Sequence, residues 1–447
     1  MKIIKINLFF FKTTYIKNFY GNINYKEMGC CGSDTKDNQT PNIKISDKNF
    51  DKEKCKSLVS SLPTRTQTNL QSLKDSMKSQ TGKLTEKERS YVVFLWECQN
   101  IDYDLESYLA HKDVDCTPEG VFKNGKTVCS GYARLYKDIA VYLELKVECV
   151  NCYAKGYGYE PGQKFNSTNH EYNVIFLNGK WIGLDATWGA GHAEGKKYIK
   201  EYNEFYFLVD PELLIKTHFP EDPKWVLSKK KYSLEDFSKW PHVYSNFYSS
   251  GFYKYSPDNG SIELKNKNTQ KITIWRNKMK DARVSCNIYL LDGNVYRQQL
   301  NVSYVNIYDD ICEIDLIFNK KGKYKIQIFG NGTGESTTHS ILDYTVNVEN
   351  DAKKELYFPT PYDKAKNINI IEPLYDNLES GEKVKFKIKS DLDTVIIIDG
   401  KWNYLNKNEN GFFEDEITIQ TQPGNNLIIG QKKGTNSCDY MVSYKVV

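Results

Sequence analysis

The sequence lacks an apolar run long enough to cross a membrane. The apolar stretch at residues 8–11 is far shorter than the roughly 20 residues of a transmembrane helix, and lysines flank it. No small-residue cleavage site follows it, so the sequence does not predict a secretory signal. We therefore expect a cytoplasmic protein with reduced thiols.

Neither sign of charge is in large excess. The 447 residues include 61 Lys and Arg and 57 Asp and Glu, for a formal net charge of +4. Five lysines and one glutamate within the first 27 residues account for that excess. A balanced remainder gives no general case for nucleic-acid binding, and we expect no nucleic-acid partner.

Spacings typical of metal ligands are missing as well. The chain has 11 cysteines and six histidines, and its close cysteine pairs are Cys30 with Cys31 and Cys149 with Cys152. The second pair has neither another cysteine pair nor a histidine cluster to complete a zinc site. The sequence therefore predicts no metal and no cofactor.

What the chain does have is room for several domains and a high aromatic content of 14%, with 33 tyrosines. Polar residues dominate up to about residue 83, and short strand-like runs separated by Gly, Asn and Asp turns recur beyond residue 250. We predict an α+β fold class, with a mixed α+β domain followed by two β-sandwich modules. The predicted limits are a flexible leader at 1–84, a catalytic domain at 85–249, and sandwiches at 250–350 and 351–447.

Two helices can be predicted in the catalytic domain. Thr85 and Glu88 have the spacing of a capping box, which predicts a helix over residues 86–99. A second helix begins near Cys129, because the apolar residues that follow recur at helical spacing. The partial positive charge of a helix N-terminus favours a thiolate, so Cys129 is a candidate nucleophile. Taken alone, a cysteine is far more often an inert, buried side chain than a nucleophile.

A hairpin supplies the partners of this thiol. Residues 170–185 read as two strands joined by the turn Asn178-Gly179, which faces Leu177 toward Lys180. In that register His170 and Asp185 are diagonal neighbours on one sheet face, about 7–8 Å apart between Cα atoms. The pattern indicates a base and the carboxylate that orients it. Singly, the two residues could be a surface histidine and a turn residue.

Other candidates rank lower. Cys98, Cys149 and Cys152 lack a helix N-terminus and are expected to serve in packing. The remaining histidines are scattered without ligand spacing, and we assign no metal or catalytic role to His111, His192, His218, His242 or His339. The backbone N–H of Cys129 could donate to a developing oxyanion. A second oxyanion donor is not evident, although Trp96 or Gln99 could supply one.

Three motifs together resemble the kyphoscoliosis peptidase family: GKTVCSGYARLY, NHEYNVIFLNGKWIGLDATWGAG and FYFLVDPELLIKTHFPED. The resemblance implies that Cys129 is the nucleophile, His170 the general base and acid, and Asp185 the residue that orients His170. It also implies a transglutaminase-like catalytic domain of papain type, followed by two immunoglobulin-like C-terminal modules. Glu171-Tyr172 departs from the family pattern, which puts substrate preference in question.

These observations predict a cysteine peptidase-like enzyme that hydrolyses amides of protein substrates through an acyl-thioester. The alternatives are transfer of the acyl group to an amine, as in a transglutaminase, and a catalytically weak scaffold that binds cytoskeletal or other proteins. An oriented nucleophile and base argue against the scaffold, since binding alone does not need them.

The N-terminal region holds one further pattern. Residues 28–33 match the N-myristoylation signal if translation starts at Met28. Gly29 would then carry the acyl chain, and palmitoylation of Cys30 or Cys31 would add the second anchor that stable attachment needs. On this hypothesis the protein lies at the cytoplasmic face of a membrane.

Overall fold

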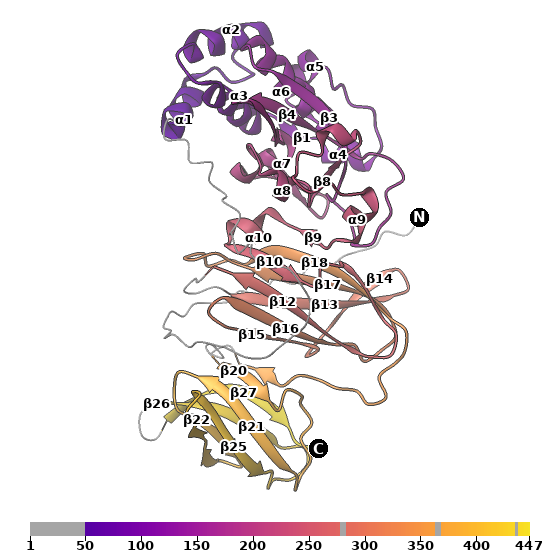
Figure 1. Cartoon of the computed structure of the whole chain (residues 1–447), viewed down its shortest axis with the longest axis vertical. Coiled ribbons are helices and arrows are strands. Elements are labelled where there is room, and N and C mark those ends of the chain that lie inside the picture. The colour runs from indigo at the N-terminus through magenta and orange to yellow at the C-terminus, as the bar shows by residue number, and fades with distance from the viewer. Residues whose placement is uncertain (1–49, 278–282, 363–367, 434–436) are drawn as a thin grey trace. The chain divides into compact units, whose positions relative to one another are not determined.

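The computed structural model describes residues 50–447 apart from three short gaps, at 278–282, 363–367 and 434–436 (Figure 1). The described residues form two compact units that divide between Val243 and Tyr244. None of the helices in the described part is both long and apolar enough to span a lipid bilayer. The domain limits predicted from the sequence stay predictions, and Gly29, Cys30 and Cys31 lie outside the described residues.

Two helices occupy part of the predicted flexible leader. They are α1 (Lys52–Ser61), capped by Asp51, and α2 (Leu70–Thr81), capped by Asn69. The prediction of a flexible leader is therefore wrong for these helices. Each helix buries a narrow apolar stripe among many polar residues, so the stripe is hidden in the average composition. The buried apolar side chains are Cys55, Val59, Leu70, Leu73 and Met77.

The next helix, α3 (Glu86–Asn100), begins as predicted. Both halves of the capping box formed by Thr85 and Glu88 are present, and most of the helix is buried. Shorter elements follow it along the chain: β1 (Asp102–Tyr103), α4 (Leu105–Leu109), α5 (Pro118–Asn124) and β2 (Lys126–Thr127), with β1 and β2 pairing in parallel.

An antiparallel sheet and one helix form the centre of the first unit. The sheet order is β5-β4-β3-β8, with bounds Lys180–Leu184, His170–Leu177, Val147–Ala154 and His218–Pro220. Helix α6 (Cys129–Tyr142) packs against β3 and β4. Its buried face carries the predicted side chains Tyr132, Leu135, Tyr136, Ile139 and Ala140.

The rest of the first unit consists of short elements that connect and cover this centre. They are α7 (Ala186–Ala190), β6 (Gly191–Glu194), β7 (Lys197–Lys200), η1 (Glu204–Tyr206), α8 (Pro211–Leu214), η2 (Pro223–Trp225), α9 (Leu234–Lys239) and β9 (His242–Val243). β6 and β7 form a small hairpin.

The second unit opens with α10 (Ser245–Ser249) and a β-sandwich. One sheet has the order β10-β12-β16-β15, with bounds Phe252–Ser256, Thr269–Arg276, Ile311–Ile317 and Ser303–Ile307. The facing sheet has the order β11-β18-β17-β13-β14, with bounds Ser261–Leu264, His339–Val348, Gly322–Gly330, Val284–Asp292 and Val295–Gln299. Alternating apolar residues from both sheets fill the core, as in β12 and β17.

A second sandwich follows. Its larger sheet has the order β19-β27-β26-β22-β23, with bounds Thr360–Pro361, Ser437–Lys445, Asn426–Lys433, Thr394–Ile398 and Lys401–Tyr404. The smaller has the order β20-β21-β25-β24, with bounds Ile368–Glu372, Lys383–Ser390, Phe412–Thr418 and Asn406–Lys407. Phe386 and Tyr444 meet edge to face between the two sheets, with ring centroids 6.2 Å apart. The predicted α+β fold class with two β-sandwich modules is confirmed.

Candidate active site

Cys129 occupies the first position of helix α6, as predicted. The residue before it, Val128, has an extended backbone and no side chain able to cap the helix. The unshared N–H groups of the first turn therefore point toward the thiol region and contribute partial positive charge. The residue Cys129 is partly exposed.

The β4–β5 hairpin has the predicted register. Leu177 pairs with Lys180, and the turn residues Asn178 and Gly179 have φ values of 50° and 81°, in the left-handed region that this tight turn requires. Asp185 follows the last residue of β5 and caps helix α7, where its Oδ1 accepts the backbone N–H of Trp188 at 3.1 Å. The turn chemistry thus fixes where the acid lies relative to β4.

The three predicted residues form one hydrogen-bonded chain. His170 Nε2 lies 2.7 Å from Asp185 Oδ2. His170 also shares a hydrogen bond with Cys129, and the backbone N–H of Glu171 donates to the same thiol. Because Nε2 is occupied by Asp185, Nδ1 is the ring nitrogen left to face the sulfur. The side chains of His170 and Asp185 are only 7% and 1% exposed.

The electrostatics of this chain favour a thiolate next to an imidazolium. Burial raises the pKa of the Cys129 thiol, but the hydrogen bond and positive charge of His170 outweigh it, so the pKa lies below its ordinary 9.0. Burial lowers the pKa of His170, yet Asp185 and Cys129 together raise it to about 10. Burial also opposes ionisation of Asp185, but His170 and His218 hold the pKa of that carboxyl well below its usual range.

Cys129 differs from every other described cysteine in this respect. Nine cysteines lie in the described residues. Burial is the largest cause of a raised pKa in all the others, namely Cys55, Cys98, Cys116, Cys149, Cys152, Cys286, Cys312 and Cys438. A raised pKa leaves a thiol protonated and a poor nucleophile at neutral pH.

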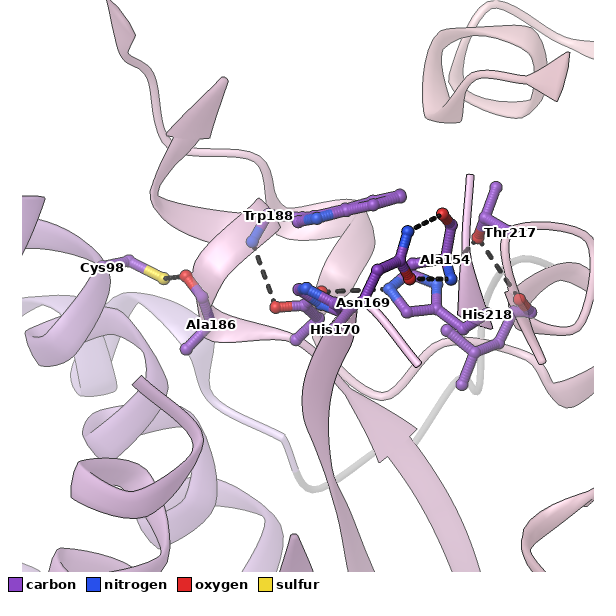
Figure 2. A network of polar contacts seen from close by, with 10 residues as sticks. Cys98, Ala154, Asn169, His170, Ala186, Trp188, Thr217 and His218 are labelled. Carbon is purple, nitrogen blue, oxygen red and sulfur yellow. Dashed lines mark hydrogen bonds and ion pairs between the residues drawn. The ribbon is translucent and has the colours of Figure 1, made fainter. Parts of the chain in front are cut away.

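One site residue was missed from the sequence. His218, to which we assigned no role, lies in β8 with its Nε2 3.1 Å from Asp185 Oδ2 (Figure 2). β8 reaches the site by pairing with β3, so that Ala154 lies opposite His218. That pairing joins segments more than 60 residues apart in the sequence, and no turn signal predicts it. The third family-like motif contains His218 and was the one available pointer.

Neither of the two suggested oxyanion donors, Trp96 and Gln99, is seen to face the thiol. The indole N–H of Trp96 donates to the Pro63 carbonyl at 3.1 Å, so this side chain serves the packing of α3. Gln99 is exposed at the end of the same helix. The side chain of Glu171 lies beside Arg134, with its Oε2 3.9 Å from Arg134 Nη2.

His170, Asp185 and His218 each offer a potential metal-ligand atom within 4.8 Å of the others. The two histidine nitrogens instead lie at hydrogen-bonding distances from one carboxylate oxygen, 2.7 Å and 3.1 Å. Hydrogen bonds within the cluster therefore satisfy these buried nitrogen and oxygen atoms.

Comparison with known proteins finds similar sequences. The family of the KY-like, immunoglobulin-like domain matches residues 234–359. Kyphoscoliosis peptidase of Mus musculus is 30% identical over 262 residues, which is 58% of this chain and 38% of the relative. The Homo sapiens protein is 29% identical over 265 residues, 59% of this chain and 38% of the relative. The chain is a homologue of the kyphoscoliosis peptidases.

The resemblance inferred from the motifs is thus confirmed, and the match spans 38% of the length of these kyphoscoliosis peptidases. A second relative, Lim and transglutaminase domain protein ltd-1 of Caenorhabditis elegans, is 31% identical over 145 residues, 30% of this chain and 20% of the relative. The chain is therefore related to proteins of the cysteine peptidase and transglutaminase-like superfamily. Red sea bream transglutaminase matches with 7% identity and a TM-score of 0.23, over 88% of this chain and 73% of that structure.

Proposed function

We propose that this protein is a thiol-dependent amide hydrolase that acts on protein substrates through an acyl-thioester. The observation that carries the proposal is the hydrogen-bonded chain Cys129–His170–Asp185, in which the one described thiol with a lowered pKa meets an imidazole of raised pKa. Nucleophile, base and orienting carboxylate are the parts that acyl transfer through a thiol needs.

The reaction follows from these groups. The Cys129 thiolate attacks the amide carbonyl, and His170 gives its Nδ1 proton to the leaving amine as the C–N bond breaks. The products of this step are a thioester on Cys129, a free amine and neutral His170. A water molecule then gives a proton to His170 Nδ1 and its hydroxyl to the thioester carbon, which releases the acid and restores the thiolate–imidazolium pair. Asp185 holds His170 in the required orientation throughout.

A pocket of about 360 Å³ opens on the thiol. Its walls come from the end of α4, the loop after it and the residue before α6, and they are both apolar and polar. The lining residues are Ser107, Tyr108, His111, Lys112, Asp113, Val114, Val128 and Cys129. A pocket of this size beside the sulfur leaves room for part of an acyl donor.

Two alternatives differ in the fate of the thioester. In a transglutaminase-type reaction an amine takes the place of water, and the same thiol and base would serve. In a scaffold that binds cytoskeletal or other proteins, the thioester would not form at all. The lowered pKa of Cys129 argues against the scaffold, because binding alone does not require a thiolate.

A thiol-directed probe separates these readings. The wild-type chain and Cys129→Ala are treated with a tagged haloacetamide at pH 6, with Cys438→Ala as the matched control because the Cys438 thiol has a raised pKa. Fast labelling that Cys129→Ala alone abolishes supports the enzyme. Lysate proteins are then examined for new N-termini, which indicate hydrolysis, and for incorporation of a biotinylated primary amine, which indicates transfer. If Cys129 labels no faster than Cys438, the scaffold is favoured.

The cytoplasmic location and the lipid anchor at Gly29 with Cys30 or Cys31 stay proposals. The location rests on the lack of a predicted secretory signal, and the anchor rests on the M-G-x-x-x-S pattern and on translation starting at Met28. Mass spectrometry of the native N-terminus tests them. A peptide that begins before Met28, or an unmodified Gly29, contradicts the anchor.

A further inference from the structure

We infer that His218 is a positioning residue that fixes the carboxylate of Asp185, and through it the base His170. The inference deepens the proposed function and rests on it. Asp185 Oδ2 is shared by two imidazoles, His170 at 2.7 Å and His218 at 3.1 Å. A residue that touches only the carboxylate acts on the reaction through His170.

The position of His218 is fixed from several sides. Its side chain is 0% exposed, and its ring centroid lies 4.4 Å from that of Trp188 and 5.4 Å from that of Tyr172. Figure 2 shows His218 and His170 beneath the Trp188 ring. A ring enclosed in this way has little freedom to turn, so its Nε2 stays directed at Asp185.

The partners of the two ring nitrogens of His218 indicate its protonation state. His218 Nδ1 lies 2.9 Å from the hydroxyl oxygen of Thr217. The carboxylate of Asp185 can only accept, so the hydrogen bond at Oδ2 requires the proton on His218 Nε2. In the neutral ring Nδ1 is then an acceptor, and the Thr217 hydroxyl, which also lies 3.3 Å from the Leu214 carbonyl oxygen, is its donor. Burial and the nearby His170 cation both oppose a second positive charge here, and they lower the pKa of His218 despite Asp185. His218 is therefore a neutral donor to the carboxylate.

Three donors thus hold Asp185 in one orientation. Oδ1 accepts the Trp188 backbone N–H, and Oδ2 accepts the Nε2–H groups of His218 and His170. A carboxylate bound at one oxygen alone can rotate about its last bond, which would carry the second oxygen away from His170. With His218 in place, the remaining lone pair of Oδ2 is directed at His170 Nε2. A neutral donor does this without competing for the charge that stabilises the imidazolium.

Two substitutions separate the donor from the volume of the ring. His218→Gln places an amide N–H near the position of Nε2, whereas His218→Leu keeps an apolar side chain without a donor. The rate constant for iodoacetamide alkylation of Cys129 at pH 6 is measured on the full chain by mass spectrometry of the Cys129 peptide. We expect His218→Leu to react about tenfold more slowly, since a hydrogen bond to a charged group is lost. His218→Gln is expected to stay within about threefold of wild type.

The matched control is His192→Gln, at an exposed histidine that pairs with Glu194 and Glu201. It should alkylate at the wild-type rate. Equal rates for wild type and a folded His218→Leu would overturn the inference. Slow alkylation of Cys129 in the wild-type chain would instead contradict the proposed function. In that case the role of His218 would still be tested by the position of its ring proton.

That proton is read by NMR of the ¹⁵N-histidine-labelled chain at pH 7, with the His218 ring assigned from its absence in His218→Gln. The expected signature is a protonated Nε2 and an unprotonated Nδ1. Thr217→Val removes the hydroxyl that selects this tautomer, so the Nδ1–H form should gain population. A doubly protonated ring, or an unprotonated Nε2 in the wild type, would overturn the inference even if His218→Leu does not fold.

Discussion

Cys152 in β3 and His170 in β4 lie directly opposite each other in the central sheet. The imidazole thus has two thiols near it, on different elements. Cys152 is fully buried, and burial raises its pKa well above the ordinary value, whereas Cys129 at the start of α6 has a lowered pKa. Proximity to the base is therefore not sufficient for activation, which also requires a direct hydrogen bond and the helix N-terminus.

Alanine substitutions should separate the two thiols. Cys129→Ala is expected to abolish hydrolysis of p-nitrophenyl acetate, used as a probe ester, with little loss of apolar packing because the residue is partly exposed. Cys152→Ala should keep most of the activity and lower the free energy of unfolding by about 1 kcal/mol, because it leaves a small cavity. Ester turnover and urea denaturation check both. Undiminished turnover in Cys129→Ala contradicts the assignment.

The thiolate–imidazolium pair should be visible in the pH dependence of stability. Above pH 6.5 and above the lowered pKa of folded Cys129, up to pH 9.0, the unfolded chain holds its proton on the Cys129 thiol, and the folded chain holds it on His170. The two states then bind equal numbers of protons at this pair, so the pair adds no slope. In Cys129→Ala the folded state keeps the His170 proton that the unfolded state releases. Stability of this variant should therefore fall as pH rises in that window.

The expected difference between wild type and Cys129→Ala grows by up to about 1.4 kcal/mol per pH unit in favour of the wild type. Urea denaturation at several pH values between 6.5 and 9.0 measures it. The double variant Cys129→Ala, His170→Gln is the control, because without the imidazole the slope should disappear. A constant difference across the window would mean that Cys129 and His170 are not an ion pair.

Asp185→Asn should reduce turnover of the probe ester without removing the nucleophile. The amide cannot stabilise the imidazolium as the carboxylate does, and it presents a donor where His170 and His218 require an acceptor. By analogy with other triads, kcat should fall by about 10⁴, less severely than in Cys129→Ala. Ester turnover of Asp185→Asn is measured beside that of Cys129→Ala, and we expect it to be the higher of the two. Wild-type turnover would show that His170 needs no orienting carboxylate.

Gly131, in the first turn of α6, should not accept a side chain. A Cβ there would lie 1.9 Å from Thr127 Oγ1, and Thr127 is buried. Gly131→Ala should therefore destabilise the protein by about 1–3 kcal/mol through overpacking. Gly82→Ala is the matched control: its nearest neighbour would be the Lys78 carbonyl oxygen at 3.7 Å, so it should be neutral or stabilise by about 0.4–1 kcal/mol. Thermal or urea unfolding distinguishes the two.

The features predicted correctly from the sequence depend on neighbours in the chain. The capping box at Thr85 and Glu88 sets the start of α3, and the Asn178-Gly179 turn sets the register of β4 and β5. That register alone brings His170 and Asp185 together. Both the capping box and the turn act on residues close to them in the chain, so a single sequence is enough to predict their effects.

The features that were missed depend on distant contacts or on weak stripes. His218 reaches Asp185 because β8 pairs with β3, a contact between distant segments that no local pattern encodes. Helices α1 and α2 are stabilised by packing rather than by composition, with Leu73 and Met77 fully buried among polar residues. The role of Trp96 depended on its partner, the Pro63 carbonyl, which the spacing of residues does not reveal.

The second compact unit should fold without the first. From Tyr244 onward the chain builds two sandwiches with their own buried cores, including Ile272, Ile326, Phe386 and Val442 at 0% exposure. A fragment of residues 244–447 should therefore give a β-type circular dichroism spectrum and a cooperative urea transition. Limited proteolysis of the full chain should release a stable fragment that begins near residue 244. Loss of both transitions together, with no protected fragment, would mean that the sandwiches require the first unit for stability.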